Sequence, residues 1–226
     1  MTTSDRLDAA VDRIYRHRFP PQILVHRSAV WKVLCDSWFS RYIPDSARVI
    51  EIAAGYCEFI KNVHAAERVA VDINPETLKY ADDGVTVYQV AAERIGEVAR
   101  ESYFDTAFAS NFLEHCSSRD QILTIFQAVA SVLKPGGRFL ILGPNFRYCY
   151  KHYFDFFDHQ LPLTDKAVVE GLQVAGFKIE LAQPRTLPFS FSRRYPSWTW
   201  LVSLYCKLPL IWPLFGKQFF IVARKP

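Results

Sequence analysis

The segment that decides the fold spans residues 49–58 and reads VIEIAAGYCE. An apolar run interrupted only by Glu51 leads into small residues and Gly55, where a strand is expected to give way to a helix. In an open α/β sheet, ligands bind at the carboxyl ends of the strands, and small residues let a ligand approach the backbone closely. The segment therefore predicts a ligand-binding turn in an α/β fold.

The chain that follows alternates between short apolar runs and helical patterns. Strands are expected at 48–53, 68–73, 85–90, 104–110 and 138–142, and helices or turns at 58–64, 75–80, 93–100 and 119–133. This alternation predicts a largely parallel sheet with helices on both faces.

The two ends of the chain depart from this alternation. Two helices at 5–18 and 28–42, separated by Pro20 and Pro21, are expected to make residues 1–45 a helical cap that could cover the ligand site. After a helix at 165–175, strands at 177–182 and 218–223 are joined by an aromatic-rich insertion at 183–216. Since no regular crossover helix joins them, they are predicted to be antiparallel neighbours. The length of 226 residues favours one domain over 1–226.

Composition excludes several classes of function and location. The net charge of +4 is mild and Lys and Arg form no long block, so a nucleic-acid partner is not expected. The five cysteines are widely spread with no C-x-x-C pair, which is typical of free thiols in a reducing compartment and predicts no metal site. No signal peptide and no run of about 20 apolar residues is recognised, so we expect a cytoplasmic protein.

The turn at 53–58 favours a nucleoside cofactor without phosphates. The full G-x-G-x-x-G pattern of dinucleotide sites is absent, and Glu58 would repel a pyrophosphate at a helix N-terminus. Asp72 follows the second strand at about the separation expected of an acid that binds ribose hydroxyls. S-adenosylmethionine (SAM) carries adenosine, a sulfonium and an amino-acid end but no phosphate, so it avoids the conflict with Glu58.

Four segments in this order resemble the motifs of class I SAM-dependent methyltransferases, and the resemblance covers roughly residues 46–182. They are 51–57, Asp72, 104–115 and 133–138. The resemblance implies a Rossmann-like seven-stranded, mostly parallel sheet of order 3-2-1-4-5-7-6 with the last strand antiparallel, and SAM as cofactor. The sequence departs from the family at Ala53 and Cys57, which replace two of three usual glycines, and at Ala91, where many relatives carry an acid; Glu93 is the expected substitute for that acid.

On this resemblance we expect ten residues to form the cofactor site. They are Glu51, Ala53, Gly55, Tyr56, Asp72, Ile73, Ala92, Glu93, Asn111 and Phe112.

The acceptor is expected to bind in the loop after the fifth strand. Residues 144–159 mix aromatic side chains with Asp and His, and such a mixture suits a polyhydroxyl acceptor because rings cover apolar sugar faces. His159 with Asp158 or Asp155 is the expected pair for acceptor binding or proton removal, and His115 is a second candidate base. The alternative is a packed lid. The predicted reaction is methyl transfer to a small molecule or glycan, on a hydroxyl of a sugar or lipid-linked saccharide.

Aromatic residues and bases also gather at 193–215, where Arg193 and Arg194 precede a run of apolar side chains at helical spacing. This pattern allows weak peripheral membrane contact, although core packing or a substrate lid is the favoured interpretation. The sequence carries no signal for the oligomeric state.

Two other functions stay open. A non-catalytic SAM-binding or partner-binding protein could use the same fold, since fold alone does not settle function, and the replaced glycines motivate that hypothesis. A nicotinamide dehydrogenase is disfavoured by Glu58 and by the missing glycines.

Overall fold

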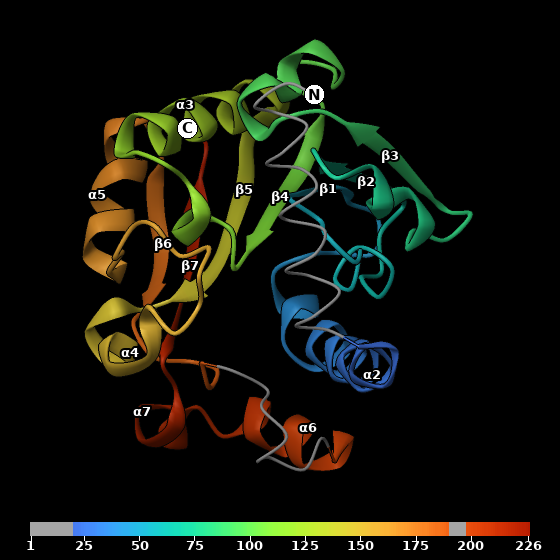
Figure 1. Cartoon of the computed structure of the whole chain (residues 1–226). Coiled ribbons are helices and arrows are strands. Elements are labelled where there is room, and N and C mark those ends of the chain that lie inside the picture. Colours follow the sequence, from blue (N-terminus) through green and yellow to red (C-terminus); the bar gives the residue numbers. More distant parts are fainter. Residues whose placement is uncertain (1–19, 190–197) are drawn as a thin grey trace.

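The computed structural model of the chain describes residues 20–189 and 198–226 (Figure 1). Its core is a seven-stranded sheet of order β3-β2-β1-β4-β5-β7-β6, as predicted. The strands are β1 Arg48–Ile52, β2 Glu67–Asp72, β3 Val85–Gln89, β4 Phe104–Ser110, β5 Leu133–Pro144, β6 Lys178–Gln183 and β7 Gln218–Arg224. Strands β1 to β5 pair in parallel, whereas β7 runs antiparallel to both β5 and β6.

Helices cover both faces of this sheet (Figure 1). The α-helices are α2 Pro21–Ser37, α3 Arg119–Val132, α4 Phe146–Tyr153, α5 Asp165–Val174, α6 Thr199–Lys207 and α7 Trp212–Phe215. Short 3-10 helices are η1 Phe39–Arg41, η2 Pro75–Lys79, η3 Ala92–Glu97, η4 Leu113–His115 and η5 Pro209–Ile211. The helix predicted at 5–18 lies outside the described residues.

Alternate residues of each central strand build two separate cores. In β1, Ile50 and Ile52 pack in the cluster that contains α3 and α5, whereas Val49 packs in the cluster that contains α2, α6 and α7. In β5, Ile141 packs in the cluster of α3 and α5, and Leu142 packs in the cluster of α2, α6 and α7. A strand that is buried on both faces reads as a continuous apolar run, which is the pattern that identified these strands.

The crossover after β1 differs from the prediction at 58–64, because residues 55–62 form consecutive turns and no helix follows them. The amide of Ile60 donates to the Glu51 carboxylate at 3.0 Å and so does not contribute to a helical ladder. The amide of Lys61 bonds to Cys57 O and that of Asn62 to Phe59 O, which mixes two turn lengths. The crossovers after β2 and β3 are likewise reduced to the short η2 and η3.

Helix α2 begins earlier than predicted. Pro20 and Pro21 were expected to break a helix, with the next one starting at Ser28, but Pro20 is the N-cap and Pro21 the first helical residue. Proline suits that position because its missing amide would have no partner within the helix and its φ angle is already helical.

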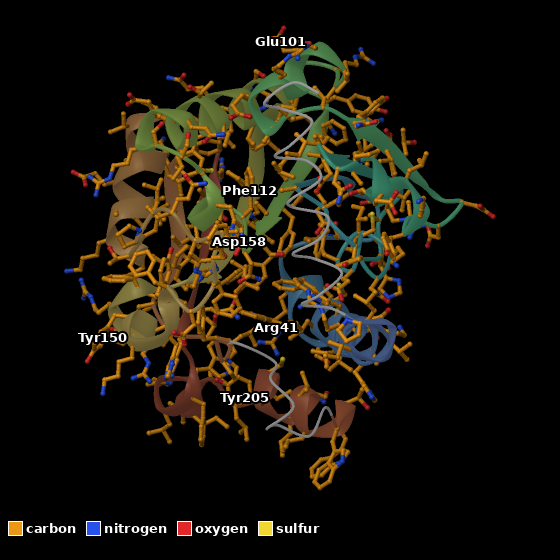
Figure 2. The ribbon with its side chains drawn as sticks, in the orientation of Figure 1. Arg41, Glu101, Phe112, Tyr150, Asp158 and Tyr205 are labelled. Carbon is orange, nitrogen blue, oxygen red and sulfur yellow. The ribbon has the colours of Figure 1, made fainter. Side chains whose placement is uncertain are left out.

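The segment between β6 and β7 packs against α2. The rings of Trp38 and Trp212 lie 5.2 Å apart, and the hydroxyls of Ser37 and Ser203 are 3.3 Å apart. In Figure 2, Tyr205 marks this layer, and its hydroxyl donates to the carbonyl of Thr186. The described part of the insertion therefore extends the α2 side of the sheet. Among helices within 20–189 and 198–226, none combines the length and the apolar character needed to cross a bilayer.

Candidate functional site

The turn after β1 has an unusual backbone. Ala53, Gly55 and Cys57 have φ angles of 55°, 51° and 55°, which lie in the left-handed region. This region costs about 1–2 kcal/mol for a residue with a Cβ, so glycine is the usual occupant. The two glycine replacements noted in the sequence therefore keep the backbone conformation that glycine would adopt.

Two carboxylates hold this turn. Glu51 is 3% exposed and accepts the Ile60 amide. Asp72, at the end of β2, accepts the Gly55 amide at 2.7 Å with one oxygen and the Asn74 amide at 2.8 Å with the other. Asp72 therefore links the end of β2 directly to the turn after β1.

Burial changes the acidity of both carboxylates. It raises the pKa of Glu51 well above the usual value of 4.5, against the opposing effect of the Ile60 amide. It also raises the pKa of Asp72, against the lowering effect of the amides that it accepts. Both shifts reflect the removal of charge from water, which disfavours the ionised form.

Helix α2 is attached to the same turn by an ion pair that the sequence did not reveal. The guanidinium of Arg27 contacts both carboxylate oxygens of Glu58, with Nε 2.8 Å from Oε1. The side chains are 24% and 9% exposed, so the pair is largely screened from solvent. The described part of the predicted N-terminal cap thus reaches the turn through Arg27.

The remaining cofactor candidates lie beyond the carboxyl ends of neighbouring strands. Tyr56 packs edge-on against Tyr80 with ring centroids 4.6 Å apart, and Ile73 is half exposed beyond β2. Glu93 follows the buried Ala92 in η3 and accepts a hydrogen bond from the Gln121 amide of α3.

Two further candidates follow β4. Asn111 has a φ of 47° and donates its backbone amide to Leu142 O at 2.9 Å. Phe112 is half-buried and lines a narrow crevice together with Leu113, Glu114, Leu142 and Gly143. The strand order places this crevice at the ends of β4 and β5, where ligands of open α/β sheets bind.

The donor set of the ten candidates fits SAM. Its charged members are the carboxylates of Glu51, Asp72 and Glu93, and it contains no Lys or Arg. Carboxylates accept hydrogen bonds from hydroxyls and amines and attract a positive sulfonium or ammonium, whereas a pyrophosphate would be repelled. The chemistry of the turn agrees with a cofactor of the SAM type.

Beside this crevice the structure brings three of the four predicted catalytic residues together. The rings of His115 and His159 lie 5.1 Å apart at a steep angle. His115 Nδ1 is 3.0 Å from Asp158 O and 3.6 Å from Asp158 Oδ2. Figure 2 marks Phe112 and Asp158 in the middle of the molecule. Asp155 lies apart from this group, because its carboxylate pairs with His152 at 3.1 Å and is largely exposed.

Aromatic rings surround His159. Phe156 stacks on its imidazole with ring centroids 4.9 Å apart. The ring centroids of Tyr153 and Phe189 lie 4.7 Å and 6.2 Å from that of the imidazole. Tyr153 belongs to α4, a helix that was expected to be a loop and that begins where the Asn145 side chain accepts the Arg147 amide. The aromatic loop is therefore partly an ordered helix.

Glu114 lies in the 104–115 motif that the sequence indicated, but it was given no role there. Its carboxylate is 4% exposed and lies 4.0 Å from His115 Nε2. Glu114 and His115 follow β4, and His159 follows β5. Because the carboxyl ends of adjacent parallel strands meet at one edge of the sheet, this order could have predicted that Glu114 lies near His159.

Residues 50–141 match the family described as a methyltransferase domain. No curated protein matches the sequence significantly.

Solved structures share the fold. A SAM-dependent methyltransferase of Thermotoga maritima, described as a possible histamine N-methyltransferase, has a TM-score of 0.65 at 17% identity, over 95% of this chain and 99% of that one. A chain of the complex between the Haloferax volcanii Trm112 methyltransferase activator and a methyltransferase has a TM-score of 0.63 at 13% identity, over 100% and 99%. A SAM-dependent methyltransferase of Archaeoglobus fulgidus gives 0.61 at 20% identity, over 86% and 94%. At such identities these likenesses establish the fold.

Proposed function

We propose that this chain is a class I SAM-dependent methyltransferase with SAM as its cofactor, and that it methylates a hydroxyl group of a sugar or of a lipid-linked saccharide. The observation that carries the acceptor class is the polar group of His115, Asp158 and His159 within an aromatic wall at the edge of the crevice. Imidazoles and a carboxylate bind hydroxyls, and rings pack on the apolar faces of a sugar.

Exposed aromatic side chains in the segment that carries Asp158 and His159 support the same acceptor class. Phe157 is 92% exposed, and Tyr150 and Phe154 are more than half exposed. All three belong to α4 or to the loop that leads from it to His159. A carbohydrate bound beside His159 would find further ring surfaces in this segment.

The residues of the chain divide the work of the reaction between binding and proton handling. Bound SAM supplies a methyl group activated by its positive sulfonium. We assign Asp72 and the turn at 53–57 to cofactor binding, with Glu51 acting through the turn that it holds. His159 and Asp158 orient the acceptor hydroxyl, and an imidazole of the pair His115 and His159 takes its proton. Positioning of the reacting groups supplies a large part of the acceleration.

A lipid-linked acceptor is supported by an apolar surface on the segment before β7. Its exposed large side chains are Trp198, Trp200, Leu201, Leu204, Leu208, Leu210, Leu214 and Phe215. Lys207 ends α6 beside them. Arg193 and Arg194 lie outside the described residues. We propose that this surface makes weak peripheral contact with a membrane that carries the acceptor.

The cytoplasm remains our proposed location. All five cysteines are free and buried, and burial raises the pKa of Cys57 and Cys116 to about 12. Unreactive thiols of this kind suit a reducing compartment.

The first experiment is calorimetric titration of the full chain with SAM, S-adenosylhomocysteine and NAD. Binding of the first two without NAD is expected, followed by a screen of methyl transfer to sugar nucleotides and lipid-linked sugars. Methyl transfer to a nitrogen acceptor and to none of the hydroxyl acceptors would overturn the acceptor class. The alternative of a non-catalytic binding protein drew on the missing glycines, and SAM binding without methyl transfer to any acceptor would favour it.

A further inference from the structure

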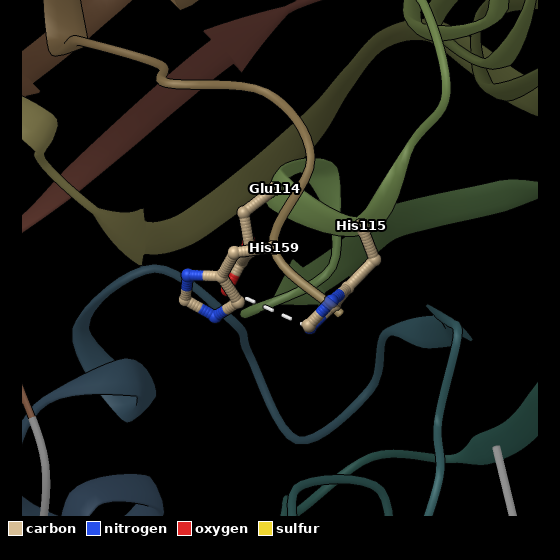
Figure 3. Close-up of side chains that lie close together, drawn as sticks. All are labelled: Glu114, His115 and His159. Atoms are coloured by element: carbon tan, nitrogen blue, oxygen red, sulfur yellow. Dashed lines mark ion pairs between the residues drawn. The ribbon is translucent and has the colours of Figure 1, made fainter. Parts of the chain in front are cut away.

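Three potential metal ligands meet beside the crevice (Figure 3). Glu114, His115 and His159 each place one ligand atom within 4.8 Å of the other two. Glu114 and His115 belong to η4 after β4, and His159 follows α4. The sequence predicted no metal site because its cysteines form no ligand pattern, but this cluster uses none of them.

The hydrogen bonds of His115 orient its ring as a ligand. A carbonyl oxygen only accepts hydrogen bonds, so the 3.0 Å contact with Asp158 O puts the imidazole proton on Nδ1. The lone pair is then on Nε2, the nitrogen that lies 4.0 Å from Glu114 Oε1. Metal-binding histidines commonly donate their other ring nitrogen to a carbonyl or a carboxylate in this way.

Backbone hydrogen bonds hold the two ligand-bearing segments in register. The Glu114 carbonyl accepts the amides of Gln160 at 2.8 Å and Leu161 at 3.2 Å. The Gln160 side chain donates to His115 O at 3.2 Å. Ligands from two segments are thus placed together before any ion binds, which lowers the cost of assembling a site.

We propose that Glu114, His115 and His159 bind one divalent first-row transition ion, with open positions directed to oxygens of the acceptor. Two imidazoles and one carboxylate suit Mn²⁺, Fe²⁺, Co²⁺ or Zn²⁺ better than Mg²⁺ or Ca²⁺, which prefer all-oxygen sites. Two metal–ligand bonds of about 2.1 Å separate ligand atoms by at most about 4.2 Å, so the widest pair closes by side-chain rotation on binding.

The role of this ion rests on the proposed function. Glu114 lines the crevice, so an ion on its carboxylate lies at the edge of the predicted cofactor site. A metal ion lowers the pKa of an oxygen that it binds, so an acceptor hydroxyl there loses its proton more readily. While the ion is bound, both imidazoles are ligands and neither takes the proton of the acceptor. The metal-bound acceptor hydroxyl then releases its proton to solvent.

The test is titration of the chelator-treated full chain with Mn²⁺, Co²⁺ and Zn²⁺. Calorimetry measures the binding of each ion, and for Co²⁺ the visible absorption of the imidazole-bound ion is recorded as well. One ion per chain is expected. His115→Ala and His159→Ala should each weaken binding at least about tenfold, as loss of a ligand costs no less than loss of its supporting shell.

His152→Ala is the matched control, because His152 also pairs with a carboxylate but is exposed and lies outside the cluster. Its metal affinity should equal that of the unchanged protein. Circular dichroism establishes that each variant is folded, and an alanine variant that unfolds is replaced by the glutamine variant at the same position. Absence of binding for all three ions, or equal loss in the His152 variant, overturns the site.

SAM titration of the chelator-treated protein separates this inference from the proposed function. If SAM binds and no metal does, the methyltransferase proposal stands and the metal site is wrong. If metal binds at the three residues and hydroxyl acceptors are not methylated with any ion present, the site stands and the acceptor proposal is wrong.

Discussion

At the scale of single residues, the turn after β1 keeps its shape with strained occupants. Ala53 and Cys57 hold left-handed backbone angles, where their Cβ atoms are unfavourable. Of the two, Ala53 is the cleaner position to test, because it is half-buried while Cys57 is fully buried and would leave a cavity as glycine.

We expect Ala53→Gly to raise the free energy of unfolding by about 1 kcal/mol, because the strain removed exceeds the added chain entropy. Urea denaturation measures the change. Ala54→Gly is the control, since Ala54 is buried without a left-handed angle and should lose stability instead. A loss at both positions would mean that the turn is not strained at Ala53.

Asp72 should carry a measurable part of SAM affinity. Asp72→Ala removes a charged acceptor and the bond to the Gly55 amide, so SAM binding should weaken by about 1–3 kcal/mol in calorimetry. Asp105→Ala is the control, because Asp105 lies near the start of β4, at the other end of the sheet, where it pairs with Lys134. Unchanged affinity in a folded Asp72 variant would remove this residue from the site.

Glu51 should make stability depend on pH. Its pKa is raised in the folded protein, so the native state holds a proton where the unfolded chain has released it. This contribution is fully present below the usual pKa of 4.5 and is lost as the pH rises through the folded value.

Glu51→Gln keeps an oxygen for the Ile60 amide but cannot titrate. Its stability relative to the unchanged protein should therefore increase as the pH rises from the usual Glu value. Urea denaturation over a series of pH values provides the measurement. A constant difference at every pH would show that Glu51 does not titrate abnormally.

At the scale of elements, α2 and the turn after β1 act together through Arg27 and Glu58. Arg27→Ala leaves a carboxylate that is 9% exposed without its guanidinium. Because the arginine is partly exposed, solvent screens part of the interaction. We therefore expect the free energy of unfolding to fall by about 1–2 kcal/mol and SAM binding to weaken.

Lys32→Ala provides the comparison on the same helix. Lys32 pairs with Asp36 at 2.9 Å, but it is 60% exposed and should cost less than about 0.5 kcal/mol. Thermal melts and SAM titration of both variants decide the matter. Equal effects from the two substitutions would mean that the Arg27 pair has no special part in holding the turn.

The elements also show where local patterns predict structure well. The predicted α3 ended within one residue of the observed Arg119–Val132, because apolar residues repeat at helical spacing and Ser118 caps its start. The segment at 58–64 fails as a helix because Glu51, a residue from the preceding strand, takes the Ile60 amide. Helix α4 was not predicted. Its aromatic and polar residues were interpreted as an acceptor-binding loop, and the helix cap at Asn145 was not recognised.

At the scale of the whole molecule, the face formed by α6, η5 and α7 gathers exposed large apolar side chains in one stretch of the chain. The full chain should sediment with vesicles that contain anionic lipid, and less of it should sediment with neutral vesicles. The apolar side chains of this face enter the bilayer, and the net charge of +4, with Lys207 on this face, is attracted to anionic lipid.

The double variant Trp200→Ser/Leu210→Ser should lose most of this binding. Val174→Ser, at an apolar position on α5 that is 68% exposed, should not. Equal sedimentation of all three proteins, or none with any vesicle, would mean that this face packs without a membrane.

The alternation of strands and helices, the candidate cofactor turn and the resemblance to methyltransferases, which implied the strand order, follow from features that are local in sequence. Apolar runs, helical spacing and turn residues act over a few positions, so they can be recognised before the chain is folded. The pairing of Arg27 with Glu58, the diversion of the Ile60 amide and the meeting of Glu114 with His159 join residues that are far apart in the chain. Such contacts depend on how the strands and helices pack. For that reason the sequence indicated His115, Asp158 and His159 as separate candidates, and only the packing of the loops after β4 and β5 brings the two histidines together with Glu114.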